Sequence, residues 1–171
     1  MSVLHFRKEL SAPPVALRLP NIASRRINLP ADIVAWLNLR QRATAELRPL
    51  PRPWSEADFR AELLSKSWWR PEQCWIAYVD NLPTDSGEII GSVTLALRAG
   101  ELATVPVVHW LLVDPAWRRR GISGLLMAHL EQAAWDVGWR EMQLETHANW
   151  EAAVAFYQSI GYAAVRGASP R

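Results

Sequence analysis

One short segment constrains the fold of this chain more than any other, because it leads from an apolar strand through a short turn into a helix. Residues 107–113 (VVHWLLV) are almost continuously apolar, which predicts a strand that is buried on both faces of a sheet. Asp114-Pro115 ends that run, and apolar side chains then recur at helical spacing over residues 121–137. A buried strand followed closely by a packed helix is typical of a mixed α/β sheet.

The rest of the chain extends this pattern. Helices are predicted from Ala31 and from Ser55, where Ser55 and Asp58 have the spacing of a capping box. Further strands are predicted over 74–79, 88–98, 141–146 and 162–165, a turn over 81–87 and a helix over 149–160. Residues 1–14 are expected to form an extended arm and residues 15–19 an edge strand that Pro20 ends. The length of 171 residues fits one domain over 1–171.

Composition excludes several classes of protein. Half of the residues are hydrophobic and 21% are charged, which excludes a disordered chain. A single cysteine, Cys74, excludes an internal disulfide and favours a reducing compartment, so we expect a cytoplasmic protein. The apolar runs are too short to span a bilayer, and no two histidines have metal-ligand spacing, so neither a membrane nor a metal is expected. Ten tryptophans raise the question of an aromatic ligand site.

Residues 118–124 (RRRGISG) have the features of an anion-binding turn. The unpaired N–H groups at the start of a helix carry partial positive charge and bind phosphate. Gly121 and Gly124 let a phosphate approach the backbone closely, because no Cβ stands in the way. The segment matches neither the Walker-A loop nor the Rossmann glycine pattern. No second basic stripe accompanies the arginines, so nucleic acid is not expected as the ligand.

With the strand before it, this segment resembles the signature of the GNAT superfamily of acetyl-CoA-dependent N-acyltransferases, in which Arg/Gln-x-x-Gly-x-Gly/Ala opens a helix. Here Arg118, Gly121 and Ser123 occupy those places, and Ser123 departs from the usual Gly or Ala. Residues 144–162 resemble the family's second block, with Asn149 before a helix, Tyr157 within it and Gly161-Tyr162 after it.

The resemblance implies a mixed sheet of about six to seven strands flanked by helices, in the single-domain GNAT-like fold. In such a fold, strands 107–113 and 141–146 splay apart and leave a slot for the pantetheine arm of acetyl-CoA. The residues it implies for cofactor binding are Leu111, Leu112 and Val113 through their backbone, the turn residues Arg118, Arg119, Arg120, Gly121, Ile122, Ser123 and Gly124, and Asn149. Asn149 has a structural alternative as the N-cap of its helix.

Tyr157 matches the family's proton donor to the leaving thiolate, and a phenol is protonated at neutral pH. Its alternative is a core aromatic residue. The general base is open: His109, which is expected to share a strand face with Val107, Leu111 and Val113, has a suitable pKa range, or is a core histidine. His147, Glu145 and water are the other candidates.

The resemblance also implies that the helices preceding residue 74 form one wall of the acceptor site. That region is rich in aromatic residues and arginines: Trp36, Trp54, Trp68 and Trp69, with Arg40, Arg42, Arg48, Arg52 and Arg70. Such a wall suits an apolar or aromatic acceptor that carries a carboxylate, such as an amino acid or a peptide terminus. The alternative is plain helix packing, with the arginine stems lying along apolar surface.

The sequence thus predicts an N-acetyltransferase that moves an acetyl group from acetyl-CoA directly to a primary amine of a small molecule or a peptide. Cys74 lies outside both blocks, which argues against an acyl-enzyme. A non-catalytic module that binds or senses acyl-CoA is the alternative, and a homodimer is compatible with either.

Overall fold

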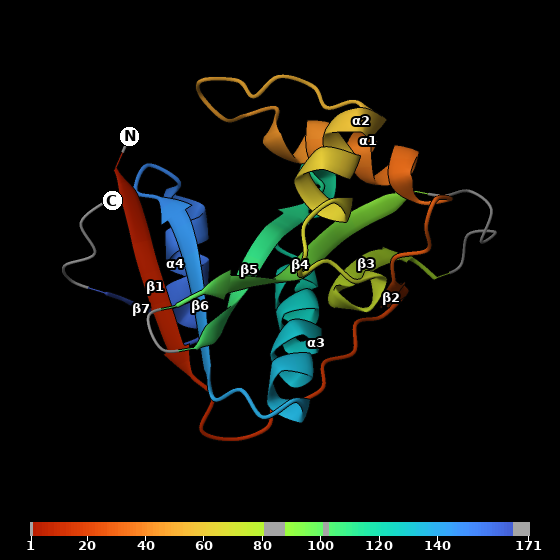
Figure 1. Cartoon of the computed structure of the whole chain (residues 1–171). Helices are drawn as coiled ribbons and strands as arrows, with labels where there is room; N and C mark the ends of the chain where they lie inside the picture. The colour runs from red at the N-terminus through yellow and green to blue at the C-terminus, as the bar shows by residue number, and fades with distance from the viewer. Residues whose placement is uncertain (1, 81–87, 101–102, 166–171) are drawn as a thin grey trace.

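A seven-stranded mixed sheet organises the chain in the computed structural model, which describes residues 2–80, 88–100 and 103–165 (Figure 1). The strands are β1 (Val3–Glu9), β2 (Ile22–Arg26), β3 (Cys74–Val79), β4 (Ile89–Ala99), β5 (Thr104–Val113), β6 (Glu141–His147) and β7 (Ala163–Ala164). Their order is β2-β3-β4-β5-β6-β1-β7. This confirms the expected fold class.

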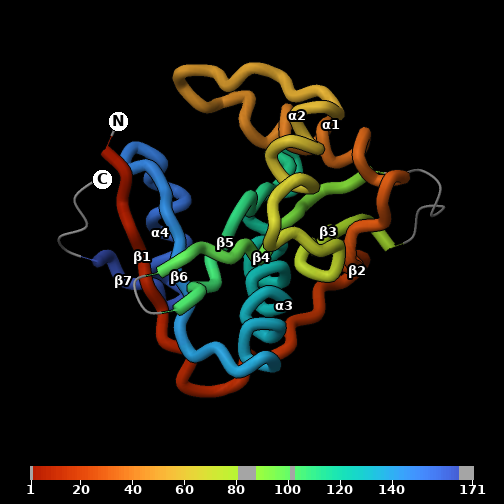
Figure 2. Tube along the Cα trace, viewed as in Figure 1, coloured from red at the N-terminus to blue at the C-terminus, as the bar shows by residue number. Residues whose placement is uncertain are grey.

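The sheet opens at its centre between β5 and β6, the two neighbouring strands that run parallel. All other neighbours are antiparallel, whereas β5 and β6 run parallel and are registered through Val107 and Gln143. Beyond that pair the two strands diverge, and the sheet takes the shape of a V (Figure 2). The divergence corresponds to the slot that was expected between strands 107–113 and 141–146.

Helices cover the two faces of the sheet differently. The α-helices are α1 (Ile33–Thr44), α2 (Glu56–Phe59), α3 (Ile122–Asp136) and α4 (Glu151–Ser159), and a π-helical turn, Arg60–Leu64, continues α2. One core cluster joins α3 and α4 to the sheet, with Leu126 and Met142 fully buried. A second cluster joins α1 and α2 to the other face, with Trp36 and Phe59 fully buried.

Local sequence explains where α2 begins. Ser55 Oγ accepts a hydrogen bond from the Asp58 amide, and the Asp58 carboxylate accepts one from the Ser55 amide. This reciprocal pair is the predicted capping box.

The N-terminal segment corrects the prediction. Residues 3–9 are extended as expected, but they form β1, which pairs with both β6 and β7 inside the sheet. The predicted edge strand at 15–19 is wrong: residues 12–18 have no regular structure, because Pro13, Pro14 and Pro20 lie within or close to them and lack backbone donors. The sequence pattern did not reveal β1, because a charged residue, Lys8, stands at a position that faces the core side. Lys8 pairs there with the buried Glu131.

The strand at 107–113 also differs from the prediction. It begins earlier, at Thr104, and is not buried on both faces, since only Val108 and Leu112 among residues 107–113 are buried. The divergence from β6 is the reason, because it leaves one edge of the strand without a closely packed neighbour. The turn predicted at 81–87 lies outside the described residues.

Candidate active site

The anion-binding turn lies at the end of β5. Asp114 Oδ1 accepts a hydrogen bond of 2.9 Å from the Ala116 amide, which starts a short 3-10 turn, Pro115–Trp117. Arg119 and Gly121 then take positive φ angles of 63° and 83°, and α3 begins. Within the part of the chain that the structure describes, no side chain caps this helix. The first-turn amides of α3 therefore remain available to an anion.

The arginines of this turn do not all point into it. Arg118 Nη1 pairs with Glu46 Oε2 at 2.5 Å, and its Nη2 donates to the Ala43 carbonyl at 3.1 Å, so this side chain lies against the end of α1. Arg120 stacks over Trp117, with its Cζ 4.8 Å from the ring centroid. The backbone of 119–124, rather than the arginine side chains, is thus the better-placed anion ligand.

Residues 15–19 lie over the same turn, which the sequence did not indicate. A Cβ on Gly121 would come 3.1 Å from Leu19 Cδ2, and one on Gly124 would come 3.5 Å from Leu17 Cδ1. Ile122 is buried, so only its backbone faces the turn. No sequence signal marks this contact, because residues 15–19 lie a hundred positions away along the chain.

A β-bulge at Trp110 decides which side chains of β5 share a face. Ser92 pairs with Leu112 and Thr94 with His109, so β5 has one more residue than β4 here, and Trp110 has a φ of 49°. Leu111 and Val113 consequently pack on the α3 side, whereas Leu112 and Trp110 join the α1 side. The expectation that His109 shares a face with Leu111 and Val113 is wrong, because the bulge reverses the alternation between them.

His109 lies instead among aromatic rings on the α1 side. Its ring centroid is 5.4 Å from that of Trp110 and 6.1 Å from that of Trp68. Burial lowers its pKa to about 4, so the imidazole is neutral at physiological pH.

Tyr157 lies in the core on the α3 and α4 side, with 8% of its surface exposed. Its ring packs against Phe156 and Tyr162, at centroid distances of 5.5 and 5.9 Å. Burial raises its pKa well above the ordinary value, so the phenol is protonated. Leu111 and Val113 pack on the same cluster, which brings Tyr157 to the side of the slot on which they lie.

The other candidates lie around the diverging end of β6. Asn149 is not the N-cap of α4, because Trp150 holds that position and the helix begins at Glu151. The His147 ring packs on Trp150 at 4.5 Å. Glu145 forms an ion pair with Arg98, and its Oε1 lies 3.3 Å from Nδ1 of His5 in β1.

The aromatic wall is built by α1, α2 and β5 together. Trp36 is fully buried and donates its indole N–H to Ser92 Oγ at 2.9 Å. Trp54 lies 6.1 Å from Trp36 and 4.9 Å from Trp110, measured between centroids. Trp110 therefore joins the tryptophans that the sequence predicted, and only the tertiary contact places it there.

Comparison with known proteins decides the family. The model of the acetyltransferase (GNAT) family matches residues 36–162, a range that includes both the turn and Tyr157. The chain belongs to the GNAT acetyltransferase family. A search of curated proteins returned no significant match.

Solved structures have the same GNAT fold. An aminoglycoside N-acetyltransferase, AAC(6')-Iy in complex with CoA, has a TM-score of 0.67 at 20% identity, over 92% of this chain and 98% of that one. The NatC complex bound to Gag peptide and CoA has a TM-score of 0.65 at 21% identity, over 82% and 84%. A GCN5-related N-acetyltransferase from Sphaerobacter thermophilus has a TM-score of 0.64 at 20% identity. It covers 99% of this chain, which spans only 45% of its length.

Other features of the molecule lie apart from this GNAT site. An open depression lined by Trp135, Trp139 and Arg140 also includes Thr104 at the start of β5, at the opposite end from Val113, and contains none of the predicted residues. The described residues include no cluster of three metal-ligating side chains. Their helices are also too short or too polar to cross a bilayer.

Proposed function

We propose that this GNAT protein is an N-acetyltransferase that uses acetyl-CoA and transfers the acetyl group directly to a primary amine. The observation that carries the proposal is the uncapped start of α3, which lies at the end of a bulged strand that diverges from its parallel neighbour. An uncapped helix start suits a diphosphate, and a diverging strand leaves backbone groups free to bind an extended arm.

The chain's own groups divide the work of binding. The amides of 119–124 would hold the pyrophosphate, and backbone groups of Leu111, Leu112 and Val113 would bind the pantetheine arm. Ser123 fits this role, because its side chain is small and can donate a further hydrogen bond. Asn149 would contact the cofactor from the turn between β6 and α4.

The chemistry needs one proton to leave and another to arrive. The acceptor nitrogen bonds to the acetyl carbon, the carbon–sulfur bond breaks, the amine loses a proton and the thiolate gains one. Tyr157, buried and protonated, supplies that second proton. His109 is the base candidate on the aromatic side: its neutral imidazole can accept a proton directly or through water, although a pKa of about 4 makes it a weak base unless substrate binding raises that pKa.

A covalent acyl-enzyme is not part of the proposal. Cys74 is fully buried in β3, and burial raises the pKa of its thiol to about 11. A thiol in that state is a poor nucleophile.

Thiol release from acetyl-CoA against a panel of amines tests the proposal. Tyr157→Phe is expected to reduce kcat by about 100-fold while CoA still raises the melting temperature. Tyr162→Phe is the matched control, because Tyr162 packs on Tyr157 in the same cluster and has no assigned role. If no amine gives release above background and CoA still stabilises the protein, the chain is a binding or sensing module instead. Equal loss in both variants would refute the assignment of Tyr157.

A further inference from the structure

Arg40 of α1 is a buried cation with no carboxylate partner in the described part of the chain. It is 5% exposed, and its Nε is buried without a hydrogen-bond partner. Its Nη1 donates to the Arg52 carbonyl at 3.3 Å, longer than an ordinary hydrogen bond. A buried charge is stable only when another group compensates it.

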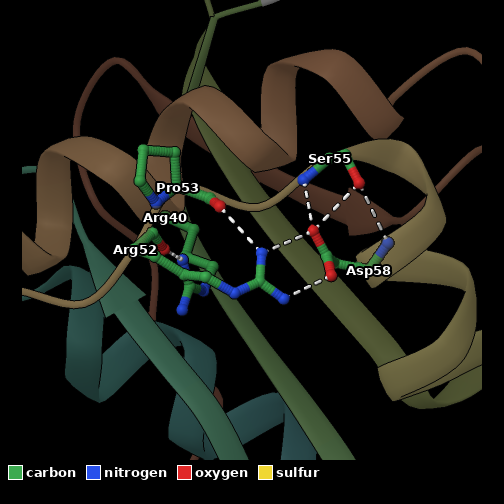
Figure 3. Close-up of polar contacts among 5 residues, drawn as sticks. All are labelled: Arg40, Arg52, Pro53, Ser55 and Asp58. Atoms are coloured by element: carbon green, nitrogen blue, oxygen red, sulfur yellow. Dashed lines mark hydrogen bonds and ion pairs between the residues drawn. The ribbon is translucent and has the colours of Figure 1, made fainter.

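The carboxylate that interacts electrostatically with Arg40 is that of Asp58, and it is hydrogen-bonded to a different arginine. Asp58 accepts hydrogen bonds of 2.9 and 2.6 Å from Arg52, and further bonds of 2.7 and 2.9 Å from the amide and hydroxyl of Ser55 (Figure 3). The Asp58 carboxylate thus neutralises Arg52, which is largely exposed. Burial and the neighbouring Arg52 charge together lower the pKa of Arg40.

Aromatic rings surround the Arg40 guanidinium. Its Cζ lies 4.0 Å from the Trp54 ring centroid and 5.2 Å from that of Trp110. The indole nitrogen of Trp110 is also buried without a partner. Among the described residues, two buried donors without an acceptor therefore lie in one aromatic cluster.

The cover over this cluster is thin. Arg52 and Pro53 are exposed and Trp54 is half-buried, so a single layer of chain separates Arg40 from solvent. Trp110 directly precedes Leu111, whose backbone is assigned to the pantetheine arm. A ligand at Arg40 would thus lie on the acceptor side of the slot.

We propose that Arg40 binds the carboxylate of the acceptor, and that the acceptor is an aromatic or apolar amino acid or short peptide. This inference rests on the proposed function. The planar guanidinium matches a carboxylate, which would replace the weak bond to the Arg52 carbonyl. The Trp36, Trp54 and Trp110 rings would contact the apolar part of the acceptor.

Matched acceptors that share one amine test the proposal. The dipeptide Phe-Gly and its amide differ in the group that Arg40 would bind and have nearly the same amine basicity; phenylalanine, phenylalaninamide and the phosphonate analogue extend the set, with rates compared per unprotonated amine because the group on the α-carbon changes the amine pKa. Wild type is expected to acetylate a carboxylate form at least about tenfold more efficiently, in kcat/KM, than its amide, because the site's buried donors stay unpaired otherwise. A preference for the phosphonate over the carboxylate, or no preference, overturns the proposal.

Variants of the two arginines assign the preference to one residue. Arg40→Gln is expected to reduce kcat/KM for the carboxylate acceptor to the level of the amide. Arg52→Gln is the matched control and should keep the preference, because Arg52 is already compensated by Asp58. A preference that survives Arg40→Gln, or that is lost equally in both variants, refutes the assignment.

A stability measurement separates binding from a structural role. Arg40→Met keeps the stem and removes a buried charge that has cation–π contacts but no ion-pair partner, so its melting temperature should equal or exceed that of wild type. A structural arginine would give a lower melting temperature, which would count against the proposal.

Calorimetry separates the failure of this inference from the failure of the proposed function. N-acetylphenylalanine and its amide are titrated into the protein saturated with CoA. Preference for the carboxylate without thiol release supports the Arg40 site and refutes the transferase. Thiol release without a preference for the carboxylate supports the transferase and refutes the Arg40 site. If there is no preference and no thiol release, the Arg40 site and the transferase are both refuted.

Discussion

Alanine variants of Gly121, Gly124 and Gly138 test the proposed anion-binding turn, because these glycines differ in backbone angle and in distance from the turn. Gly121 and Gly138 have φ angles of +83° and +93°, a region in which alanine is strained. Gly124 is the third residue of α3 and has ordinary helical geometry. The three variants therefore separate backbone strain from loss of the anion site.

The expected stabilities follow from these angles. Alanine in the left-handed region costs about 1–2 kcal/mol, so Gly121→Ala and Gly138→Ala should lower the melting temperature by about 2–8 °C in a chain of this size. The Cβ at residue 121 meets the flexible end of Leu19 at 3.1 Å, whereas nothing lies within 4 Å at residue 138. Gly124→Ala should instead stabilise the protein by about 0.5–1 kcal/mol, since its Cβ meets Leu17 at an ordinary 3.5 Å and alanine favours helix.

CoA affinity should follow the opposite pattern. The proposed function places a phosphate on the amides of 119–124, so a Cβ at residue 124 is expected to cost one charge-assisted hydrogen bond, which is about 1.5–3 kcal/mol, or about 10- to 100-fold in Kd. Gly138→Ala, at the far end of α3, should bind CoA like wild type despite its lower stability. Thermal unfolding and calorimetry with CoA measure both quantities. A Gly124→Ala protein that binds CoA normally, or that melts below wild type, would refute the reasoning.

Three further predictions use single groups. Because burial lowers the pKa of His109 to about 4, the unfolded chain binds more protons than the folded one between pH 6.5 and 4. Acidification across that window should cost up to about 3 kcal/mol of stability, and His109→Gln should flatten that part of the profile in denaturant titrations. Lys8→Met leaves the carboxylate of Glu131 buried without its partner and should cost about 3 kcal/mol in urea unfolding, with Lys8→Met/Glu131→Leu recovering most of the loss; additive losses would contradict this. Cys74 should react with a thiol reagent at pH 8 only after unfolding, and labelling of the native protein would contradict its burial.

Local rules were sufficient for the turn and most of the elements. The capping box at Ser55 and Asp58, the strand at 74–79 and the start of α3 each depend on residues within a few positions of one another. The glycine at residue 121 also follows from local conformation, because a left-handed backbone conformation just before a helix favours glycine whatever the tertiary surroundings.

Long-range pairing decided what the sequence could not indicate. The face of His109 depends on a bulge that exists only where β5 meets β4, so counting alternate residues along the strand failed. β1 was missed because Lys8 interrupts its apolar pattern, and its partner Glu131 lies on α3. The sequence shows that a side chain is charged, but the residue that neutralises that charge can lie far away along the chain and is known only from the fold.

The tryptophans show the same division. The sequence by itself determined that this chain forms a mixed sheet and that a tight turn with a left-handed glycine leads into α3, since adjacent residues set backbone angles and helix ends. Only the tertiary structure decided that Trp54 from the α1–α2 loop and Trp110 from β5 enclose Arg40, because three segments must pack together before a buried charge can lack a partner. Backbone conformation is determined largely by near neighbours, whereas burial and electrostatic compensation are properties of the whole fold.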